Sequence, residues 1–321
     1  MEKERLRLLI KVCQLYFQEG LNQQSIAARY GISRSQVSRM ISSAKTEGLV
    51  EITIRNPFGD EAALEKELVS KFNLRDVIVV DTSEADNSLA DVLLAQAGAA
   101  FLESVIKDND IIGVMAGKSI SSLGREIKDP QKKNLQFVPL VGGWGAAGIE
   151  WHANTNVSLL AKNTKGNYWM LHAPAVVSTL EIRNTIVREP EIYKVMALSS
   201  KADVAVIGIG QISEDATYAK SLNMSPEEIE ALAKKGAVGS ICTSFINDEG
   251  LEISTEVKER MIGIQGEELK KIPQVVGIAR GKEKTAAIHA ALKGGWVNVL
   301  ITDMGTAQEL LQKEYTRGNL T

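Results

Sequence analysis

The chain has 321 residues, of which 44% are hydrophobic and 24% charged, the proportions of a soluble globular protein with about two domains. No stretch approaches the roughly eighteen apolar residues of a membrane span, and the amino terminus lacks the apolar segment and cleavage site of a secretory signal. Cys13 and Cys242 lie far apart in apolar surroundings, which favours buried thiols over a disulfide or a metal pair. These features argue against a membrane or secreted protein, and they predict a cytoplasmic protein without a metal or cofactor.

Charge is distributed unevenly along the chain. Residues 1–56 contain nine Lys or Arg and five Asp or Glu, a net charge of +4, which leaves −7 for residues 57–321 out of a total of −3. A basic amino-terminal segment followed by an acidic remainder is typical of a small nucleic-acid-binding module joined to a domain that does not bind DNA. Because an excess of +4 is modest, one copy would bind DNA weakly, and we expect a homo-oligomer, either a dimer or a tetramer.

The first 48 residues have the pattern of a helix-turn-helix. A first helix is expected from Lys3 to Gly20, and two further helices follow, separated by a turn at Gly31. Ser33 or Ser35 can cap the last of these helices by accepting from its free backbone N–H groups. Its apolar residues recur at i, i+3, i+4 and i+7, the spacing of one buried helix face. They are Val37, Met40, Ile41 and Ala44.

The polar face of this last helix predicts binding to double-stranded operator DNA. Its residues are Arg34, Ser35, Gln36, Ser38 and Arg39. In a major groove, Arg can pair with guanine and Gln with adenine, while Ser suits phosphates. The alternative is an ordinary helical hairpin with a solvated face.

The segment that follows marks a domain boundary. Residues 49–55 alternate as a short strand, which would be the wing of a winged helix, and residues 56–59 form a turn cluster. We therefore expect a DNA-binding domain at 1–56 and an effector-binding and oligomerisation domain at 57–321. This second domain would begin with an amphipathic linker helix at 60–72, capped by Asp60.

From Arg75 onward, short apolar runs alternate with helical stretches. The runs occupy residues 76–80, 110–115, 136–143, 202–210, 275–279 and 298–303. Unbroken β-branched runs separated by helices predict an α/β domain with a largely parallel sheet covered on both faces. Ligands in such folds bind at the carboxyl ends of the strands, where several of these runs end in Gly-rich or polar turns.

One such turn predicts an anion site. A buried strand leads into Gly117, Lys118 and Ser119, where a helix starts. Backbone N–H groups there, with the Lys118 ammonium and the hydroxyls of Ser119 and Ser121, would form a phosphate cradle. The loop is not a Walker A motif, since Gly113 and Gly117 have three residues between them instead of four. The alternative is a plain strand-to-helix turn.

Three other loops have weaker signals. The backbone at Gly142 and Gly143 could approach a ligand closely, and Trp144 could either cover a sugar or pack in the core. Residues 280–284 place basic groups before a helix, which suggests a second anion site or a solvated loop. Hydroxyl and carboxylate groups suited to a polyol follow a glycine turn at 236–239. They belong to Ser240, Thr243 and Asp248.

With these loops located, the chain resembles the SorC-type transcriptional regulators. The resemblance covers residues 32–52 and is specific in five sequence motifs, at 138–143, 202–210, 236–242, 283–295 and 298–303. It implies a helix-turn-helix followed by a Rossmann-like effector domain related in fold to sugar-phosphate isomerases and deaminases, without catalytic duty. It also implies a tetramer on paired operator sites that phosphorylated sugars release or remodel.

Carried over, the resemblance assigns phosphate binding to Gly117, Lys118 and Ser119, and further contacts to Gly142, Gly143 and Lys284. Four positions depart from the family pattern. Ala116 replaces a common Trp, Val141 replaces a lysine that forms a Schiff base in some members, Ser240 replaces an acid, and Arg280 replaces a glycine. Val141 implies non-covalent binding. A lost carboxylate and a gained guanidinium suggest that the ligand carries a second acidic group.

These observations predict a DNA-binding regulator, expected to be a repressor, of a sugar or carbohydrate catabolic operon, controlled by a phosphorylated sugar. The alternative is a sugar-phosphate isomerase or deaminase with a DNA-binding appendage, because fold alone does not exclude catalysis. No general-base constellation is legible beside the phosphate loop, so we expect no enzymatic activity.

Overall fold

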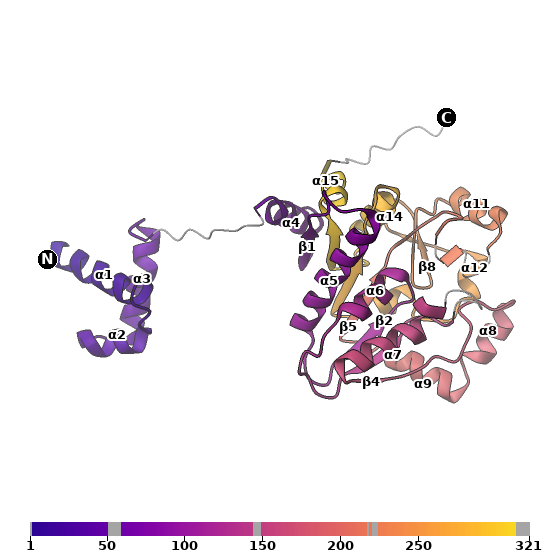
Figure 1. Ribbon diagram of the computed structural model, residues 1–321, viewed down its shortest axis with the longest axis horizontal. Coiled ribbons are helices and arrows are strands. Elements are labelled where there is room, and N and C mark those ends of the chain that lie inside the picture. The colour runs from indigo at the N-terminus through magenta and orange to yellow at the C-terminus, as the bar shows by residue number, and fades with distance from the viewer. Residues whose placement is uncertain (1, 51–58, 144–148, 217, 220–223, 313–321) are drawn as a thin grey trace. The chain divides into compact units, whose positions relative to one another are not determined.

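The computed structural model describes residues 2–50, 59–143, 149–216, 218–219 and 224–312. The chain divides into two compact units, residues 1–57 and 58–321, which are described separately (Figure 1). Residues 51–55 of the expected wing strand, and Trp144, lie outside the described residues.

The described part of the first unit, residues 2–50, contains three helices around a small apolar core. They are α1 (Glu2–Phe17), α2 (Gln23–Tyr30) and α3 (Arg34–Thr46). The turn between α2 and α3 depends on Gly31, whose φ of 63° lies in the left-handed region that favours glycine. Val12 of α1, Ile26 of α2 and Val37 of α3 are fully buried against one another. The helix-turn-helix predicted from the sequence is therefore confirmed.

Helix α3 starts with a reciprocal capping box. The Ser33 hydroxyl accepts from the Gln36 backbone N–H at 3.2 Å, and the Gln36 side chain accepts from the Ser33 N–H at 2.8 Å. Of the two candidate caps, Ser33 fills the role and Ser35 does not. The Ser35 hydroxyl lies 2.9 Å from that of Ser33.

The second unit is built on a seven-stranded parallel sheet with the order β1-β11-β10-β5-β2-β3-β4. The strands are β1 (Asp76–Val80), β2 (Ile111–Val114), β3 (Gln136–Pro139), β4 (Asn167–Tyr168), β5 (Val204–Gly208), β10 (Gln274–Ile278) and β11 (Val299–Asp303). All six runs predicted as strands belong to this sheet, which confirms the predicted α/β class. The two-residue edge strand β4 carried no apolar run and was not predicted.

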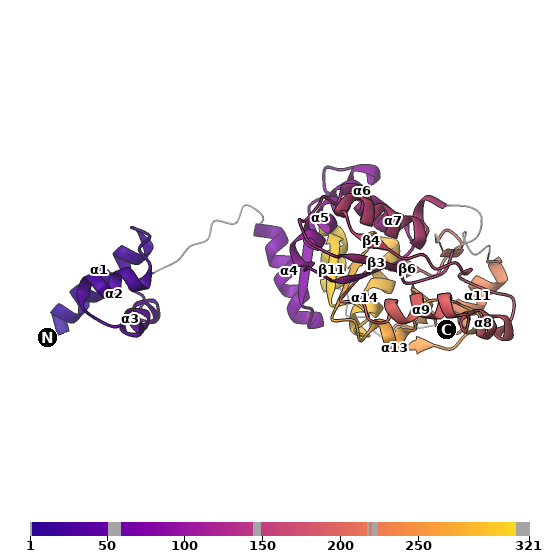
Figure 2. The same cartoon turned by 90° about the horizontal axis from the view of Figure 1, so that it is seen from below.

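Both faces of the sheet are covered, as the continuous apolar runs require. The described helices of this unit are α4 (Gly59–Phe72), α5 (Asn87–Val105), α6 (Lys118–Glu126), α7 (Ala153–Thr164), α8 (Leu180–Ile186), α9 (Pro190–Ser199), α11 (Pro226–Lys234), α12 (Glu256–Glu259), α13 (Gly266–Leu269), α14 (Thr285–Lys293) and α15 (Met304–Gln312), with short 3₁₀ turns η1 (Ile149–Trp151) and η2 (Lys282–Lys284). In β5, Val204 and Val206 pack into one buried cluster with α5, α6 and α7, while Ala205 and Ile207 pack into another with α4, α14 and α15. Figure 2 shows α5, α6 and α7 on one side of the strands and α14, α9 and α13 on the other.

A smaller antiparallel sheet flanks α14 and was not predicted. Its strands are β6 (Gly210–Gln211), β7 (Gly239–Ile241), β8 (Ser244–Ile246) and β9 (Glu252–Ile253), in that order. Strand β6 begins at Gly210, the last residue of the run predicted at 202–210, and β7 begins at Gly239, the last residue of the glycine turn predicted at 236–239. Two to three residues per strand are too few for a period-two pattern to emerge from the sequence.

Helix α4 belongs to the second unit. Leu68 is fully buried, and the Glu65 carboxylate accepts from the Val79 N–H of edge strand β1 at 2.9 Å. The Lys71 ammonium donates to the Leu310 and Leu311 carbonyls at the end of α15, at 3.1 and 2.9 Å. The predicted linker helix is therefore packed on the effector domain.

One residue of α4 differs from expectation. Asp60, expected to cap the helix, lies within its first turn because the helix already begins at Gly59. In the first turn the negative charge of the Asp60 carboxylate still interacts favourably with the positive end of the helix dipole.

One described helix, α5, has the length and apolar composition of a membrane span. In this fold Leu94 and Leu102 of α5 pack with strand residues in a buried cluster, so the helix serves as a cover for the sheet. Both cysteines are free and buried as predicted, and burial raises the pKa of Cys242 to about 12.

The capping box gives a direct test of the α3 start. Ser33→Ala removes the hydroxyl acceptor, which should cost about 1 kcal/mol and make the α3 amides exchange roughly fivefold faster with solvent hydrogen. Hydrogen exchange by mass spectrometry on the whole chain measures this. Ser42→Ala, an exposed change on the same helix, is the control and should leave exchange unaltered. Equal effects of both changes would contradict the capping role.

Candidate functional site

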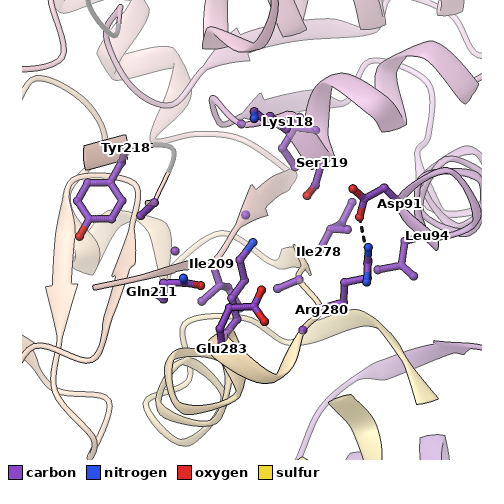
Figure 3. A pocket seen from close by; sticks show the side chains of 18 of the residues that line it. Asp91, Leu94, Lys118, Ser119, Ile209, Gln211, Tyr218, Ile278, Arg280 and Glu283 are labelled. Carbon is purple, nitrogen blue, oxygen red and sulfur yellow. Dashed lines mark hydrogen bonds and ion pairs between the residues drawn. The ribbon is translucent and has the colours of Figure 1, made fainter. Parts of the chain in front are cut away.

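A cavity of about 650 Å³ lies at the carboxyl ends of β2, β5 and β10 (Figure 3). These strands are neighbours in the sheet, so the loops after them meet at one edge. The loops are residues 115–120, 208–211 and 278–284, and the amino-terminal part of α5 completes the wall.

The amino terminus of α6 opens into this cavity without a side-chain cap. Gly117 precedes the helix with a φ of 142°, a conformation that side chains rarely tolerate. Its own N–H donates to the Trp151 carbonyl at 2.8 Å. The amides of Lys118, Ser119 and Ile120 come before the first intrahelical bond, which runs from the Ser121 N–H to the Gly117 carbonyl. Free amides and a helix dipole at one point favour an anion.

The loop before α6 is held in place by α7. Asn156 is fully buried and donates through Nδ2 to the Met115 carbonyl at 3.1 Å. The Ser121 hydroxyl donates to the Glu150 carbonyl at 2.9 Å and is buried. Ser121 therefore faces η1, and it does not line the cavity as predicted for a cradle hydroxyl.

Positive charge in the cavity comes from three lysines, Lys118, Lys282 and Lys284. The Lys118 ammonium lies 4.8 Å from the centre of the Trp151 ring, a cation–π contact that leaves its hydrogen-bond donors available. Burial lowers the pKa of Lys284, an effect that Lys118 and Arg280 strengthen and that Glu283 and Asp91 oppose. Placing the charged Lys284 ammonium in this cavity therefore lowers the stability of the native fold.

The Arg280 guanidinium is already occupied. Its Nε donates to Asp91 Oδ1 at 2.8 Å, drawn as a dashed line in Figure 3, and Nη2 donates to the Asn87 carbonyl at 2.8 Å. Asp303 Oδ2 lies 3.8 Å from Nη1. Arg280 was expected to make the pocket more attractive to anions. In the structure its guanidinium instead balances carboxylates of the protein itself.

The structure brings six of the predicted effector residues together in the cavity wall. They are Gly117, Lys118, Ser119, Ser240, Arg280 and Lys284. Gly142 and Gly143 are not among the described residues that line it. A Cβ on Gly142 would lie 2.6 Å from the Pro174 carbonyl oxygen, so this glycine permits close packing of the protein's own backbone. Thr243 is also used internally, donating to the Ile264 carbonyl at 2.6 Å.

Two residues that line the cavity, Asp91 and Gln211, were not predicted as site residues from the sequence. Gln211 directly follows the predicted run at 202–210, so the rule that ligands bind at carboxyl ends of strands could have found it. Asp91 gave no such signal, because it lies inside α5 and reaches the cavity only through the packing of that helix.

The DNA-contacting residues predicted on α3 share an accessible surface of the first unit. Arg34, Ser35, Gln36 and Arg39 are exposed and Ser38 is partly exposed. Gln36 Oε1 is engaged in the capping box, which leaves the Nε2 donors for other partners. Arg39 Nε makes only a long 3.4 Å contact to the Ser35 carbonyl.

The Lys284 environment predicts an unusual stability effect. A lowered pKa means that the native fold holds the charged lysine less well than the unfolded chain does. Lys284→Met should therefore raise the melting temperature of the ligand-free protein at neutral pH. The gain should shrink as the pH rises through the lowered pKa, since the native lysine then loses its proton.

The control is Lys282→Met, an exposed lysine in the same turn, which should leave the melting temperature unchanged. Differential scanning calorimetry of both variants across neutral and alkaline pH provides the measurement. A lower melting temperature for Lys284→Met would mean that Glu283 and Asp91 stabilise the charge more than burial destabilises it.

Comparison with known proteins agrees with this two-part organisation. Residues 56–312 match the family model described as "Putative sugar-binding domain", and residues 2–51 match a homeodomain-like domain. The chain is 30% identical over 311 residues to the deoxyribonucleoside regulator of Bacillus subtilis, covering 97% of this chain and 99% of that protein. It is 32% identical over 312 residues to the transcriptional regulator LsrR of an Enterobacter species, covering 95% and 92%.

A solved structure shares the whole architecture. The full-length sorbitol operon regulator SorC of Klebsiella pneumoniae superposes with a TM-score of 0.76 at 28% identity, covering 96% of this chain and 99% of that one. The chain therefore belongs to the sugar-binding-domain family of SorC-type transcriptional regulators, with a helix-turn-helix domain at its amino terminus.

Proposed function

We propose that this regulator is a cytoplasmic repressor of a sugar or carbohydrate catabolic operon, and that a phosphorylated sugar bound in the cavity controls it. The observation that carries the proposal is the uncapped start of α6, which opens into the cavity beside Lys118 and Lys284. A phosphate is the anion that best matches several free amides and two ammonium groups at one point.

Binding is proposed to be reversible and without catalysis. Val141 is buried, and an alkyl side chain at this position forms no Schiff base with a sugar aldehyde. The relatives are named as regulators, which supports a binding role for the cavity. Turnover of aldose, ketose or amino-sugar phosphates by the purified protein would overturn this part of the proposal.

The regulator is proposed to act as a homodimer or homotetramer. The modest charge of residues 1–56 supports this, because a second recognition helix adds the phosphate contacts that one copy lacks. Effector binding would then change the spacing between recognition helices, by favouring one of two subunit arrangements.

Thermal denaturation with a panel of sugar phosphates tests the effector site. A ligand at about one hundred times its dissociation constant should stabilise the protein by roughly 2.7 kcal/mol, or about 5–10 °C for a domain of this size. Unphosphorylated sugars should give no shift, and the double variant Lys118→Ala Ser119→Ala should lose the shift. A shift retained in that variant would place the anion elsewhere.

DNA binding by α3 is tested with operator fragments selected by the wild-type protein. Arg34→Ala and Arg39→Ala should each weaken binding by about 1–3 kcal/mol if they contact base edges. If they contact phosphates, each should lower the slope of log affinity against log salt by about one unit. Fluorescence anisotropy at several salt concentrations separates these cases. The control is Lys11→Ala, which removes an exposed basic side chain of α1. An equal loss of DNA affinity in this variant would argue against a specific role for α3.

A further inference from the structure

The cavity contains a polar group that the anion site does not use. Gln211, on β6, points toward the middle of the cavity from the side opposite the Asp91–Arg280 pair (Figure 3). Its Oε1 is buried and has no hydrogen-bond partner among the described residues. A buried amide oxygen without a partner is unfavourable by about 1–3 kcal/mol, so a ligand group that donates a hydrogen bond to it gains that free energy.

Nearby groups add hydrogen-bonding capacity without charge. Ser240 on β7 pairs in register with Gly210, the residue before Gln211. A Cβ on Gly210 would lie 2.5 Å from the Ser240 hydroxyl oxygen, so glycine there leaves room for that hydroxyl in the cavity wall. A carboxamide and a hydroxyl together suit a sugar hydroxyl, which both donates and accepts hydrogen bonds.

The charge of the cavity limits the ligand to one strongly anionic group. Four Lys or Arg and three Asp or Glu side chains occur among the described residues that line it, an excess of one positive charge. The Arg280 guanidinium is held by Asp91 and by the Asn87 carbonyl. A second phosphate would have to displace these partners and would meet Asp91 and Glu283 as like charges. One phosphate at the start of α6 already offsets the excess.

We propose that Gln211 is a specificity-determining residue whose carboxamide binds a hydroxyl of the effector, and that the effector carries a single phosphate. This inference rests on the proposed function and narrows it to hydroxylated monophosphates. It also replaces the earlier expectation of a second acidic group on the ligand, because the Arg280 on which that expectation rested is already paired.

Calorimetric titration of the full chain tests the proposal with defined probes. The panel contains inorganic phosphate, propyl phosphate, ribose 5-phosphate, glucose 6-phosphate, fructose 6-phosphate and fructose 1,6-bisphosphate. Propyl phosphate carries the anionic head without hydroxyls, so the ratio of its dissociation constant to that of the tightest sugar monophosphate measures hydroxyl recognition. In Gln211→Met this ratio should fall about tenfold, while the affinity for propyl phosphate stays within about twofold.

Two controls keep the result interpretable. Gln308→Met places the same change on the exposed surface of α15 and should leave the ratio unaltered. The ligand-free melting temperature of Gln211→Met should not fall, since the variant removes an unpaired polar group. Gln211→Leu, a second apolar variant, should reproduce the loss of hydroxyl recognition.

The outcomes separate this inference from the proposed function. Anion binding with an unchanged ratio in Gln211→Met and Gln211→Leu overturns the role of Gln211. Fructose 1,6-bisphosphate binding more than about tenfold tighter than every monophosphate overturns the single-phosphate inference. If no phosphorylated probe binds the wild-type chain, the phosphate site itself is wrong and the inference falls with it.

Discussion

Parallel pairing of β2, β5 and β10 is the constraint on which the cavity depends. The register aligns Val114, the last residue of β2, with Val206, and it aligns Gly208 with Ile278, so the three strands end within two residues of one another. Each exit then supplies a different kind of group: the amides of α6, the carboxamide of Gln211, or the charges of residues 280–284. Antiparallel pairing would send neighbouring loops to opposite edges and separate these groups.

Buried polar contacts hold the loops in position once the strands have placed them. Asn156 anchors the Met115 carbonyl, and the Gly117 N–H is taken by the Trp151 carbonyl. Because these internal bonds satisfy the backbone of the loop, the amides left over are those of the first turn of α6. The helix start remains free because the protein uses its other donors elsewhere.

The rim of the cavity and helix α4 contact the same helix, α15. On one side, the Gly281 N–H donates to the Thr306 hydroxyl and the Thr285 hydroxyl donates to Glu309, both at 2.9 Å. On the other side, the carbonyls at the end of α15 accept from Lys71 of α4. A movement of residues 280–285 would therefore act directly on α15. Helix α15 in turn contacts α4, the helix that follows the DNA-binding unit in sequence.

The sequence by itself determined the helix-turn-helix, the six principal strands and the loop at Gly117, because each depends on local signals. Apolar spacing, a capping serine and a glycine at a left-handed turn act within a few residues of one another. The tertiary structure decided which predicted site residues share a cavity. Ser121 and Gly142 are used for internal packing, Arg280 is neutralised by Asp91 from a helix almost two hundred positions earlier, and Gln211 enters through a two-residue strand. Contacts between residues so far apart in sequence arise only when the sheet and its covering helices have formed, which local patterns do not encode.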